Sequence, residues 1–242
     1  MSAATDASPV IKILVVGDAG VGKTSVIQRY INNSFGPKVP TVGVDFFIKE
    51  VALDNGRSGS SSATTVRVQL WDIAGQDRAK KVNRVYFKGA LGALIVYDIS
   101  RPQTFDSAAK WKQELDASIT LPNGRGLPAV LLGNKVDLEV AKVDVSYVDR
   151  FVQTHGFVAW SDVSAKDMSN AEFDISVACL VSRLLCDEEL FGPGMRRSAA
   201  AFSKRVKERG TPPSGVHLGS RGLRLATAAS GNGLTHSKGC CG

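Results

Sequence analysis

The chain has 242 residues, of which 43% are hydrophobic and 22% charged, and its formal net charge is +7. These proportions are ordinary for a globular protein that buries a core, and they exclude fibrous and wholly disordered chains. No run of about 18 apolar residues is present, so no membrane-spanning helix is expected. The start, MSAATDASPV, lacks the basic and apolar regions of a signal peptide.

The positive charge is concentrated near the C-terminus. Residues 192–242 hold nine Lys or Arg against one Glu, so this segment carries +8 and leaves −1 for the rest of the chain. The segment is also rich in Gly, Ser, Ala and Pro, so burial of apolar side chains cannot offset the entropy of ordering it. We therefore expect a disordered N-terminus over residues 1–9, one folded domain over 10–191 and a disordered basic tail over 192–242.

Within the expected domain, apolar runs alternate with segments of helical spacing. The β-branched run Val10–Val16 predicts a buried parallel strand, and Ser25–Ile31 has the periodicity of a helix. Residues 32–40, with two prolines and a glycine, predict a mobile loop, and the Ser-rich stretch 54–64 predicts a long hairpin loop. Further strands are expected over 44–53, 66–72, 91–98, 129–133 and 157–160, and further helices over 105–119, 145–155 and 169–190.

This alternation predicts an α/β fold with a mostly parallel sheet and helices on both faces. In such sheets, ligands bind beyond the carboxyl ends of the strands. Four polar clusters follow strand ends in this sequence, at residues 17–24, 72–76, 134–137 and 164–166. We expect the four clusters to meet at one edge of the sheet.

The first cluster, Gly17–Thr24, has the sequence GDAGVGKT and matches the phosphate-binding pattern G-x-x-x-x-G-K-[ST]. Glycine at 17 and 22 allows backbone angles that a Cβ atom would hinder, so successive N–H groups can face an anion at the start of the following helix. We expect Lys23 to reach the β- and γ-phosphates and the Thr24 hydroxyl to contribute to a Mg²⁺ site.

The third cluster, Asn134-Lys135-Val136-Asp137, suits a guanine base. The Asp137 carboxylate can accept hydrogen bonds from guanine N1–H and the exocyclic amine, whereas adenine presents an acceptor at the first of these positions. Binding of ATP would leave this carboxylate unpaired, and mismatches of that kind discriminate by roughly 10⁴. The cluster therefore predicts specificity for guanine nucleotides.

The motifs GDAGVGKT, TVGVDF, WDIAGQD, GNKVD and VSAK occur in this order. Over residues 10–190 they resemble the Ras superfamily of small GTPases, and WDIAGQ after GVDF resembles its Rab branch. The stretches RVYFKGA, YDISRPQTF, KWKQELD and LPNG resemble the Rab subgroup associated with lysosome-related organelles. This resemblance implies a P-loop G-domain with a six-stranded sheet, bound GTP or GDP with Mg²⁺, and GTP hydrolysis that is slow without an activating protein.

The resemblance also assigns roles to individual residues. Thr41 and Asp72 would join Thr24 at Mg²⁺, and Gln76 would orient the attacking water, with Lys23 as its catalytic partner. Phe46, Trp71 and Tyr86 match an aromatic triad that Rabs present to effectors. The nucleotide-binding set implied is Asp18, Ala19, Gly20, Val21, Gly22, Lys23, Thr24, Ser25, Phe35, Thr41, Gly75, Asn134, Lys135, Asp137, Ser164, Ala165 and Lys166.

The ending Gly239-Cys240-Cys241-Gly242 resembles the paired-cysteine terminus of Rabs, in which both thiols receive geranylgeranyl groups. Two lipid chains give stable anchoring, and a basic tail favours an anionic cytosolic leaflet. The implied partners are an exchange factor, an activating protein, the Rab escort protein, the GDP-dissociation inhibitor and effectors, with no nucleic acid. The implied setting is vesicle trafficking on the cytoplasmic face of endosomal or lysosome-related membranes, with a soluble cytosolic pool.

Two departures from the Rab pattern leave an alternative open. Phe35 resembles the aromatic that stacks on guanine, but it lies six residues before Thr41, where most Rabs have seven. Asp77 stands where Glu is usual. The alternative is a GTP-binding scaffold with negligible hydrolysis, and an ATP-dependent P-loop enzyme is a more distant one.

Overall fold

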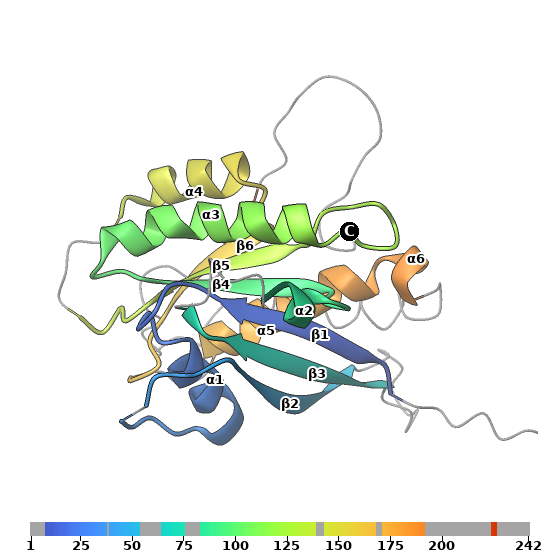
Figure 1. Ribbon diagram of the computed structural model, residues 1–242, viewed down its shortest axis with the longest axis horizontal. Coiled ribbons are helices and arrows are strands. Elements are labelled where there is room, and N and C mark those ends of the chain that lie inside the picture. The colour runs from blue at the N-terminus through green and yellow to red at the C-terminus, as the bar shows by residue number, and fades with distance from the viewer. Residues whose placement is uncertain are drawn as a thin grey trace, which may run out of the picture.

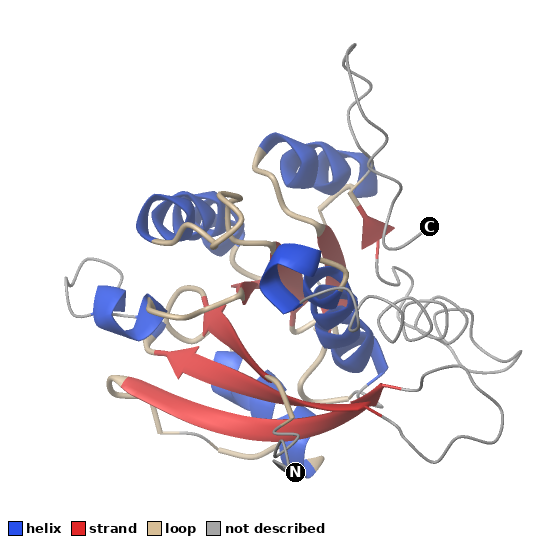
Figure 2. Ribbon diagram, turned by 90° about the vertical axis from the view of Figure 1, so that its right-hand side faces the viewer, coloured by secondary structure: helices blue, strands red, loops and turns tan. Residues whose placement is uncertain are grey.

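The computed structural model describes residues 8–37, 39–53, 64–75, 83–138, 143–167, 171–191 and 224–226. These residues form one seven-stranded sheet in the order β2-β3-β1-β4-β5-β6-β7, with helices on both of its faces (Figure 1, Figure 2). The strands are β1 Val10–Val16, β2 Val44–Leu53, β3 Thr64–Ile73, β4 Gly92–Asp98, β5 Ala129–Asn134, β6 Ala159–Val163 and β7 Arg224–Leu225. The helices are α1 Lys23–Asn32, α2 Asn83–Phe87, α3 Pro102–Ser118, α4 Val145–Thr154, α5 Ala171–Leu185 and α6 Glu188–Phe191.

The centre of the sheet is parallel. Strand β1 pairs in parallel with β3 and β4, and β5 pairs in parallel with β4 and β6, whereas β2 and β7 pair antiparallel at the two edges. The carboxyl ends of β1, β3, β4, β5 and β6 therefore lie at one edge of the sheet. In Figure 1 this edge is on the left.

Two apolar layers cover the sheet. Side chains of successive strand residues point to opposite faces, so Ile13 and Val15 of β1 pack in the layer with α1 and α5, while Leu14 packs in the layer with α3 and α4. Trp111 of α3 and Trp160 of β6 are the largest fully buried side chains, and both belong to the second layer. Burial on both faces explains the continuous apolar run in β1.

The predicted α/β fold with a mostly parallel sheet is confirmed, but the count of six strands was wrong. The seventh strand, β7, comes from the segment 192–242, for which we expected disorder. The structure describes only residues 224–226 of that segment. The hairpin predicted over 54–64 lies, except for Thr64, outside the described residues.

Most predicted elements have bounds that shift by one to three residues, two of them for a clear physical reason, and one helix was missed. The strand predicted over 157–160 begins later because the Phe157 N–H still bonds the Val152 carbonyl at the end of α4. It continues through the polar but buried Ser161 and Asp162, which the apolar pattern did not include. The helix predicted over 169–190 divides into α5 and α6 because the Asp187 side chain accepts the Glu189 N–H and starts a new helix. Helix α2 was not predicted.

Gly92, the first residue of β4, allows α5 to approach the sheet closely. A Cβ atom at this position would lie 3.0 Å from Leu180 Cδ2 of α5. Leu180 is fully buried. The contact between β4 and α5 therefore depends on the absence of a side chain at Gly92.

We expect Gly92→Ala to destabilise the folded protein by about 1–3 kcal/mol through overpacking. Leu180→Ala should cost about 2–5 kcal/mol because it leaves a cavity. In the double variant the added methyl group fills part of that cavity, so the loss in free energy of unfolding should be smaller than the sum of the two. Urea denaturation of the GDP-loaded proteins measures all three values, and strict additivity would contradict the contact.

Candidate nucleotide-binding site

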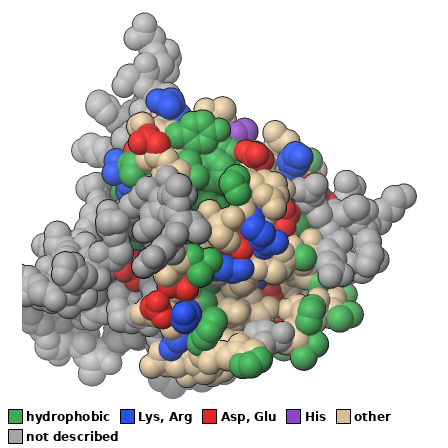
Figure 3. Space-filling model, turned by 90° about the vertical axis from the view of Figure 1, so that its left-hand side faces the viewer, with side chains coloured by type: hydrophobic (Ala, Val, Ile, Leu, Met, Phe, Trp, Pro, Cys, Tyr) green, Lys and Arg blue, Asp and Glu red, His purple; other side chains and the backbone are tan. Residues whose placement is uncertain are grey.

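A cavity of about 410 Å³ opens at the carboxyl ends of the parallel strands. Figure 3 views the molecule from this side, where Lys and Arg side chains gather beside Asp and Glu near the centre of the face. The four polar clusters that follow strand ends all have members at this cavity. Its predicted lining residues are Ala19, Gly20, Gly22, Lys23, Thr24, Ser25, Phe35, Thr41, Gly75, Asn134, Lys135, Asp137, Ala165 and Lys166, and Val39 and Pro40 join them without having been predicted.

The loop between β1 and α1 requires glycine at two positions. Gly17 has a φ of 142°, and a Cβ atom there would lie 2.1 Å from the Val96 carbonyl oxygen. Gly22 has a φ of 97°, and its Cβ atom would lie 2.3 Å from Asn134 Nδ2. Helix α1 begins at the next residue, so its unpaired N–H groups and the positive end of its dipole face the cavity.

Lys23 is held under this loop. Its ammonium group donates to the carbonyl oxygens of Gly17 at 2.9 Å and Asp18 at 3.0 Å, and the residue is only 6% exposed. Burial lowers the pKa of Lys23 to about 8, against the opposing effect of the Asp72 carboxylate. A buried cation next to an N-terminal helix end makes this part of the cavity suited to phosphate.

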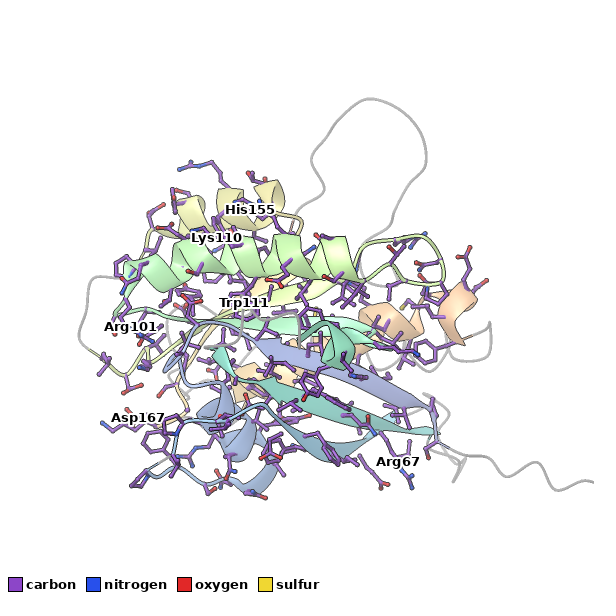
Figure 4. All side chains as sticks on the ribbon, in the orientation of Figure 1. Arg67, Arg101, Lys110, Trp111, His155 and Asp167 are labelled. Carbon is purple, nitrogen blue, oxygen red and sulfur yellow. The ribbon has the colours of Figure 1, made fainter. Side chains whose placement is uncertain are left out.

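Asp18 and Val21 were predicted to bind the nucleotide but do not line the cavity. Trp111 Nε1 donates to Asp18 Oδ1 at 3.0 Å, which fixes the loop to α3. Val21 is fully buried, and its carbonyl oxygen accepts Asn134 Nδ2 at 2.8 Å. Arg101, at the start of α3, also donates to the Ala19 carbonyl at 3.0 Å, and Figure 4 places Arg101 and Trp111 along that helix.

Thr24, Thr41 and Asp72 form an oxygen cluster at the end of the cavity nearest β3. Thr24 Oγ1 lies 2.5 Å from Asp72 Oδ2 and 2.8 Å from Thr41 Oγ1, and Thr41 Oγ1 lies 3.3 Å from the same carboxylate oxygen. Asp72 is fully buried, and its Oδ1 has no hydrogen-bond partner among the described residues. Burial raises the pKa of Asp72, against the hydrogen bond from Thr24.

This oxygen cluster fits a Mg²⁺ ion. Mg²⁺ prefers oxygen ligands and is bound in phosphate sites by one or two carboxylates together with phosphates and water. A buried carboxylate with an unpaired oxygen is costly, and a cation would offset that cost. The three residues predicted as metal ligands are therefore brought together with chemistry that suits the ion.

The base-recognition clusters after β5 and β6 are tied to each other and to the phosphate loop. Asn134 Oδ1 accepts the Ala165 N–H at 3.2 Å, while its Nδ2 group bonds Val21 as described above. The Ser164 hydroxyl donates to Asp137 Oδ1 at 2.6 Å. Ser164 is 3% exposed and does not line the cavity, so it contacts the cavity only through Asp137. Phe35, at 49% exposure, lines the cavity despite the shortened loop.

Asp98 supports the site but was not predicted. It is 1% exposed at the end of β4, and its Oδ2 accepts Lys135 Nζ at 2.6 Å and Arg101 Nε at 3.0 Å. Burial raises the pKa of Asp98, but the hydrogen bonds from Lys135, Ser100 and Arg101 outweigh it, so the pKa lies below its ordinary value. Its place at a strand end on the same edge was a signal that could have revealed it.

Arg29 of α1 also supports the site and was also missed. Its Nε donates to the Ala165 carbonyl and its second terminal nitrogen to the Lys166 carbonyl, each at 2.8 Å. These bonds attach the loop after β6 to the end of α1. Nothing in the local sequence distinguishes Arg29 from an ordinary exposed helix residue.

The three predicted effector aromatics lie together, Phe46 on β2, Trp71 on β3 and Tyr86 on α2. The ring centroids of Phe46 and Trp71 are 5.9 Å apart, and those of Trp71 and Tyr86 are 6.5 Å apart. Phe46 is 58% exposed, whereas Trp71 and Tyr86 also pack against the second apolar layer. Lys12 Nζ lies 3.5 Å above the Trp71 ring, which adds a cation–π contact.

Three predicted residues lie outside the described part of the chain: Gln76, Cys240 and Cys241. Gly75, the last described residue before Gln76, packs against the phosphate loop, where a Cβ atom would lie 2.4 Å from Asp18 C and Ala19 N. Gln76 therefore follows directly after a residue that contacts the phosphate loop.

Comparison with known proteins agrees with this geometry. Residues 12–179 match the model of the Ras family. Ras-related protein Rab-32 of Mus musculus is 46% identical over 182 residues, covering 74% of this chain and 78% of the relative. Ras-related protein Rab-7L1 of Homo sapiens is 44% identical over 160 residues, covering 66% and 75%. The chain therefore belongs to the Ras family and is a GTPase of the Rab group that includes Rab-32 and Rab-7L1.

Proposed function

We propose that this chain is a Rab-type switch that binds GTP or GDP with Mg²⁺ in the 410 Å³ cavity and recruits effectors in its GTP-bound state. The observation that carries the proposal is the position of Thr41, whose hydroxyl lies 2.8 Å from Thr24 Oγ1 and 3.3 Å from Asp72 Oδ2. Thr41 thus reaches the oxygen cluster of Thr24 and Asp72 from the loop after α1. Gly75, which follows β3, packs against the phosphate loop at Asp18 and Ala19.

In this mechanism the phosphates lie against the start of α1 and the Lys23 ammonium group. Thr24, Thr41 and Asp72 would hold Mg²⁺, which would supply positive charge to neutralise the phosphate oxygens. Only the third phosphate of GTP reaches Thr41 and the Gly75 N–H, so both segments are fixed by GTP and released after hydrolysis. Gln76 orients the water that attacks this phosphate.

In this mechanism Asp137 selects the base. Hydrogen bonds within the protein hold Asp137 and the neighbouring Ala165 backbone in place without a ligand. Ser164 orients the Asp137 carboxylate, and Asn134 holds the Ala165 backbone in place for the guanine oxygen. The Lys135 side chain lines the cavity between them, with its ammonium group fixed by Asp98. Phe35 covers the base from the open side.

Effectors are proposed to bind the aromatic cluster of Phe46, Trp71 and Tyr86. Phe46 follows Thr41 by five residues along the chain, and Trp71 stands one residue before Asp72. Any displacement of the segments around Thr41 and Gly75 would therefore move the neighbouring aromatic side chains. An exchange factor and an activating protein would act on the same segments.

Membrane attachment is proposed to use Cys240 and Cys241. The helices of the described part of the chain include none that is long and apolar enough to cross a bilayer. Geranylgeranyl groups on both cysteines, delivered by a Rab escort protein and masked by a GDP-dissociation inhibitor, would place the protein on endosomal or lysosome-related membranes with a cytosolic pool.

The switch mechanism is tested by GTP hydrolysis with and without a Rab-type activating protein. We expect the activator to accelerate the native protein by about 10³–10⁵, as in related GTPases, and to leave Gln76→Leu at its basal rate. Release of phosphate in single turnovers measures both. Equal, slow rates for native and variant proteins in the presence of activator would contradict the switch and favour the GTP-binding scaffold.

Asp137→Asn should weaken GTP binding by about 10²- to 10⁴-fold, because two hydrogen bonds to a charged group are lost at about 1.5–3 kcal/mol each. The new amide can instead donate to the 2-carbonyl of xanthine, so affinity for xanthosine triphosphate should rise. Titration with fluorescent nucleotides measures both affinities. Asp167→Asn, an exposed carboxylate on the same side of the molecule (Figure 4), is the matched control and should bind GTP normally.

Loss of both terminal thiols should abolish membrane attachment. In cells, Cys240→Ser with Cys241→Ser should move the protein wholly into the soluble fraction, while each single substitution leaves one lipid chain and partial, reversible attachment. Fractionation of tagged proteins measures the distribution. A double variant that still sediments with membranes would show that another feature anchors the chain.

A further inference from the structure

A short segment of the basic tail pairs with the edge of the sheet. Strand β7 lies antiparallel to β6, with Leu225 opposite Ala159 and Arg224 opposite Trp160. Figure 2 shows this strand as a short arrow at the edge of the sheet. The Ala226 N–H extends this pairing by donating to the Val158 carbonyl at 3.1 Å. Residues 224–226 therefore add a strand where β6 would otherwise present unpaired backbone groups.

Side chains hold the same three residues in place. Arg224 lies 3.0 Å from Asp149 Oδ2 of α4, and the other oxygen of this carboxylate accepts Trp160 Nε1 at 2.8 Å. Asp149 thus links the tail, α4 and β6. Ala226 packs against the apolar layer that contains Trp160. Backbone, charge and apolar contacts all specify the same position.

We propose that residues 224–226 form a latch that ties the tail to β6 and sets how far the GTPase domain stands from its lipid anchor. Its effect on the anchor rests on the proposed lipidation of Cys240 and Cys241. Without the latch, the 49 residues 192–240 link α6 to the first lipidated cysteine. With it, only the 14 residues 227–240 do so.

Chain length gives the size of this effect. A fully extended chain spans about 3.3–3.6 Å per residue, so 49 residues reach about 170 Å and 14 residues about 50 Å. The latch therefore reduces the maximum distance between domain and bilayer more than threefold. It also moves the origin of the tether from the end of α6 to the β6 edge, which changes the side of the domain that faces the membrane.

The latch also divides the charge of the tail. Residues 192–223 hold seven Lys or Arg and one Glu, whereas residues 227–242 hold Lys238 alone. Both ends of the basic part are thus attached to the domain, at Phe191 of α6 and at Arg224 of β7. Attraction between this basic part and an anionic leaflet would act on the domain itself rather than on the distal tether.

Hydrogen exchange of the full-length, unlipidated protein tests the latch independently of lipidation. We expect peptides that cover residues 222–228 to exchange about tenfold more slowly than peptides from 211–218, because they contain residues 224–226, whose backbone pairs with the β6 edge. Mass spectrometry after proteolysis measures both. Equal exchange of the two segments would overturn the latch.

Ala226→Pro supplies the decisive variant because proline removes the N–H that bonds Val158. It should abolish the protection of residues 222–228, whereas Ala229→Pro, beyond the latch, should leave it intact. Arg224→Glu, which places like charges beside Asp149, should reduce the protection as well. Bound GDP and the melting temperature should match the native protein in all three, which separates release of the latch from unfolding.

The tether is tested with lipidated protein on vesicles of neutral and anionic lipid that carry a dansyl lipid. The three tryptophans of the chain all lie in the domain and serve as energy-transfer donors. Transfer should fall in Ala226→Pro and remain unchanged in Ala229→Pro. Equal transfer in native and Ala226→Pro proteins would overturn the tether role, whereas failure of native lipidated protein to bind vesicles would contradict the proposed anchor and leave the exchange result to decide the latch.

Discussion

The buried carboxylate of Asp72 is the constraint that ties Thr24 and Thr41 to strand β3. The register of β3 against β1 places Asp72 opposite Val15, two residues before the phosphate loop begins. One of its oxygens accepts Thr24 and Thr41, and the other has no partner among the described residues. A desolvated charge of this kind is destabilising until a cation joins it. Binding of Mg²⁺ with a nucleotide would therefore also stabilise the folded domain by mass action.

The rest of the site consists of loops held by hydrogen bonds within the protein and of two segments, around Thr41 and Gly75, that the proposed switch would release. Asn134 bonds both the phosphate loop and the loop after β6, and Arg101 joins Asp98 to the Ala19 backbone. These bonds are made within the protein and do not depend on a ligand. Among the described residues, the side chain of Thr41 in contrast bonds only to the oxygen cluster, and Gly75 packs against the backbone of the phosphate loop. In the proposed switch, nucleotide-dependent change would therefore be confined to the segments of Thr41 and Gly75, while the residues that face the base and the phosphates stay in place.

The bounds of elements were predicted most accurately from the sequence where a pattern of adjacent residues determines the element. Strands β1 and β2 have the predicted bounds because their apolar residues are continuous or alternate over the whole strand. Most cavity-lining residues belong to loop motifs at strand ends, whereas Val39 and Pro40, in the loop after α1, were not predicted. The supports were not predictable in this way, because Trp111 has the spacing of a core residue and reaches Asp18 only in the folded chain. Strand β7 has two residues, too few for any period, and its position depends wholly on β6 and Asp149.

The two edges of the sheet differ in whether their edge strand is covered by another segment of the chain. Strand β2 pairs only with β3 among the described strands, and it carries Phe46 and Ile48 with their side chains 58% and 48% exposed. An exposed edge strand is a template for pairing with another chain. The β6 edge, on the opposite side, is covered by the chain's own residues 224–226. Closure of this edge leaves β2 as the open one among the described strands, next to Trp71. A partner that adds a strand there would meet the domain beside the segments of Thr41 and Gly75, where the proposed switch would act.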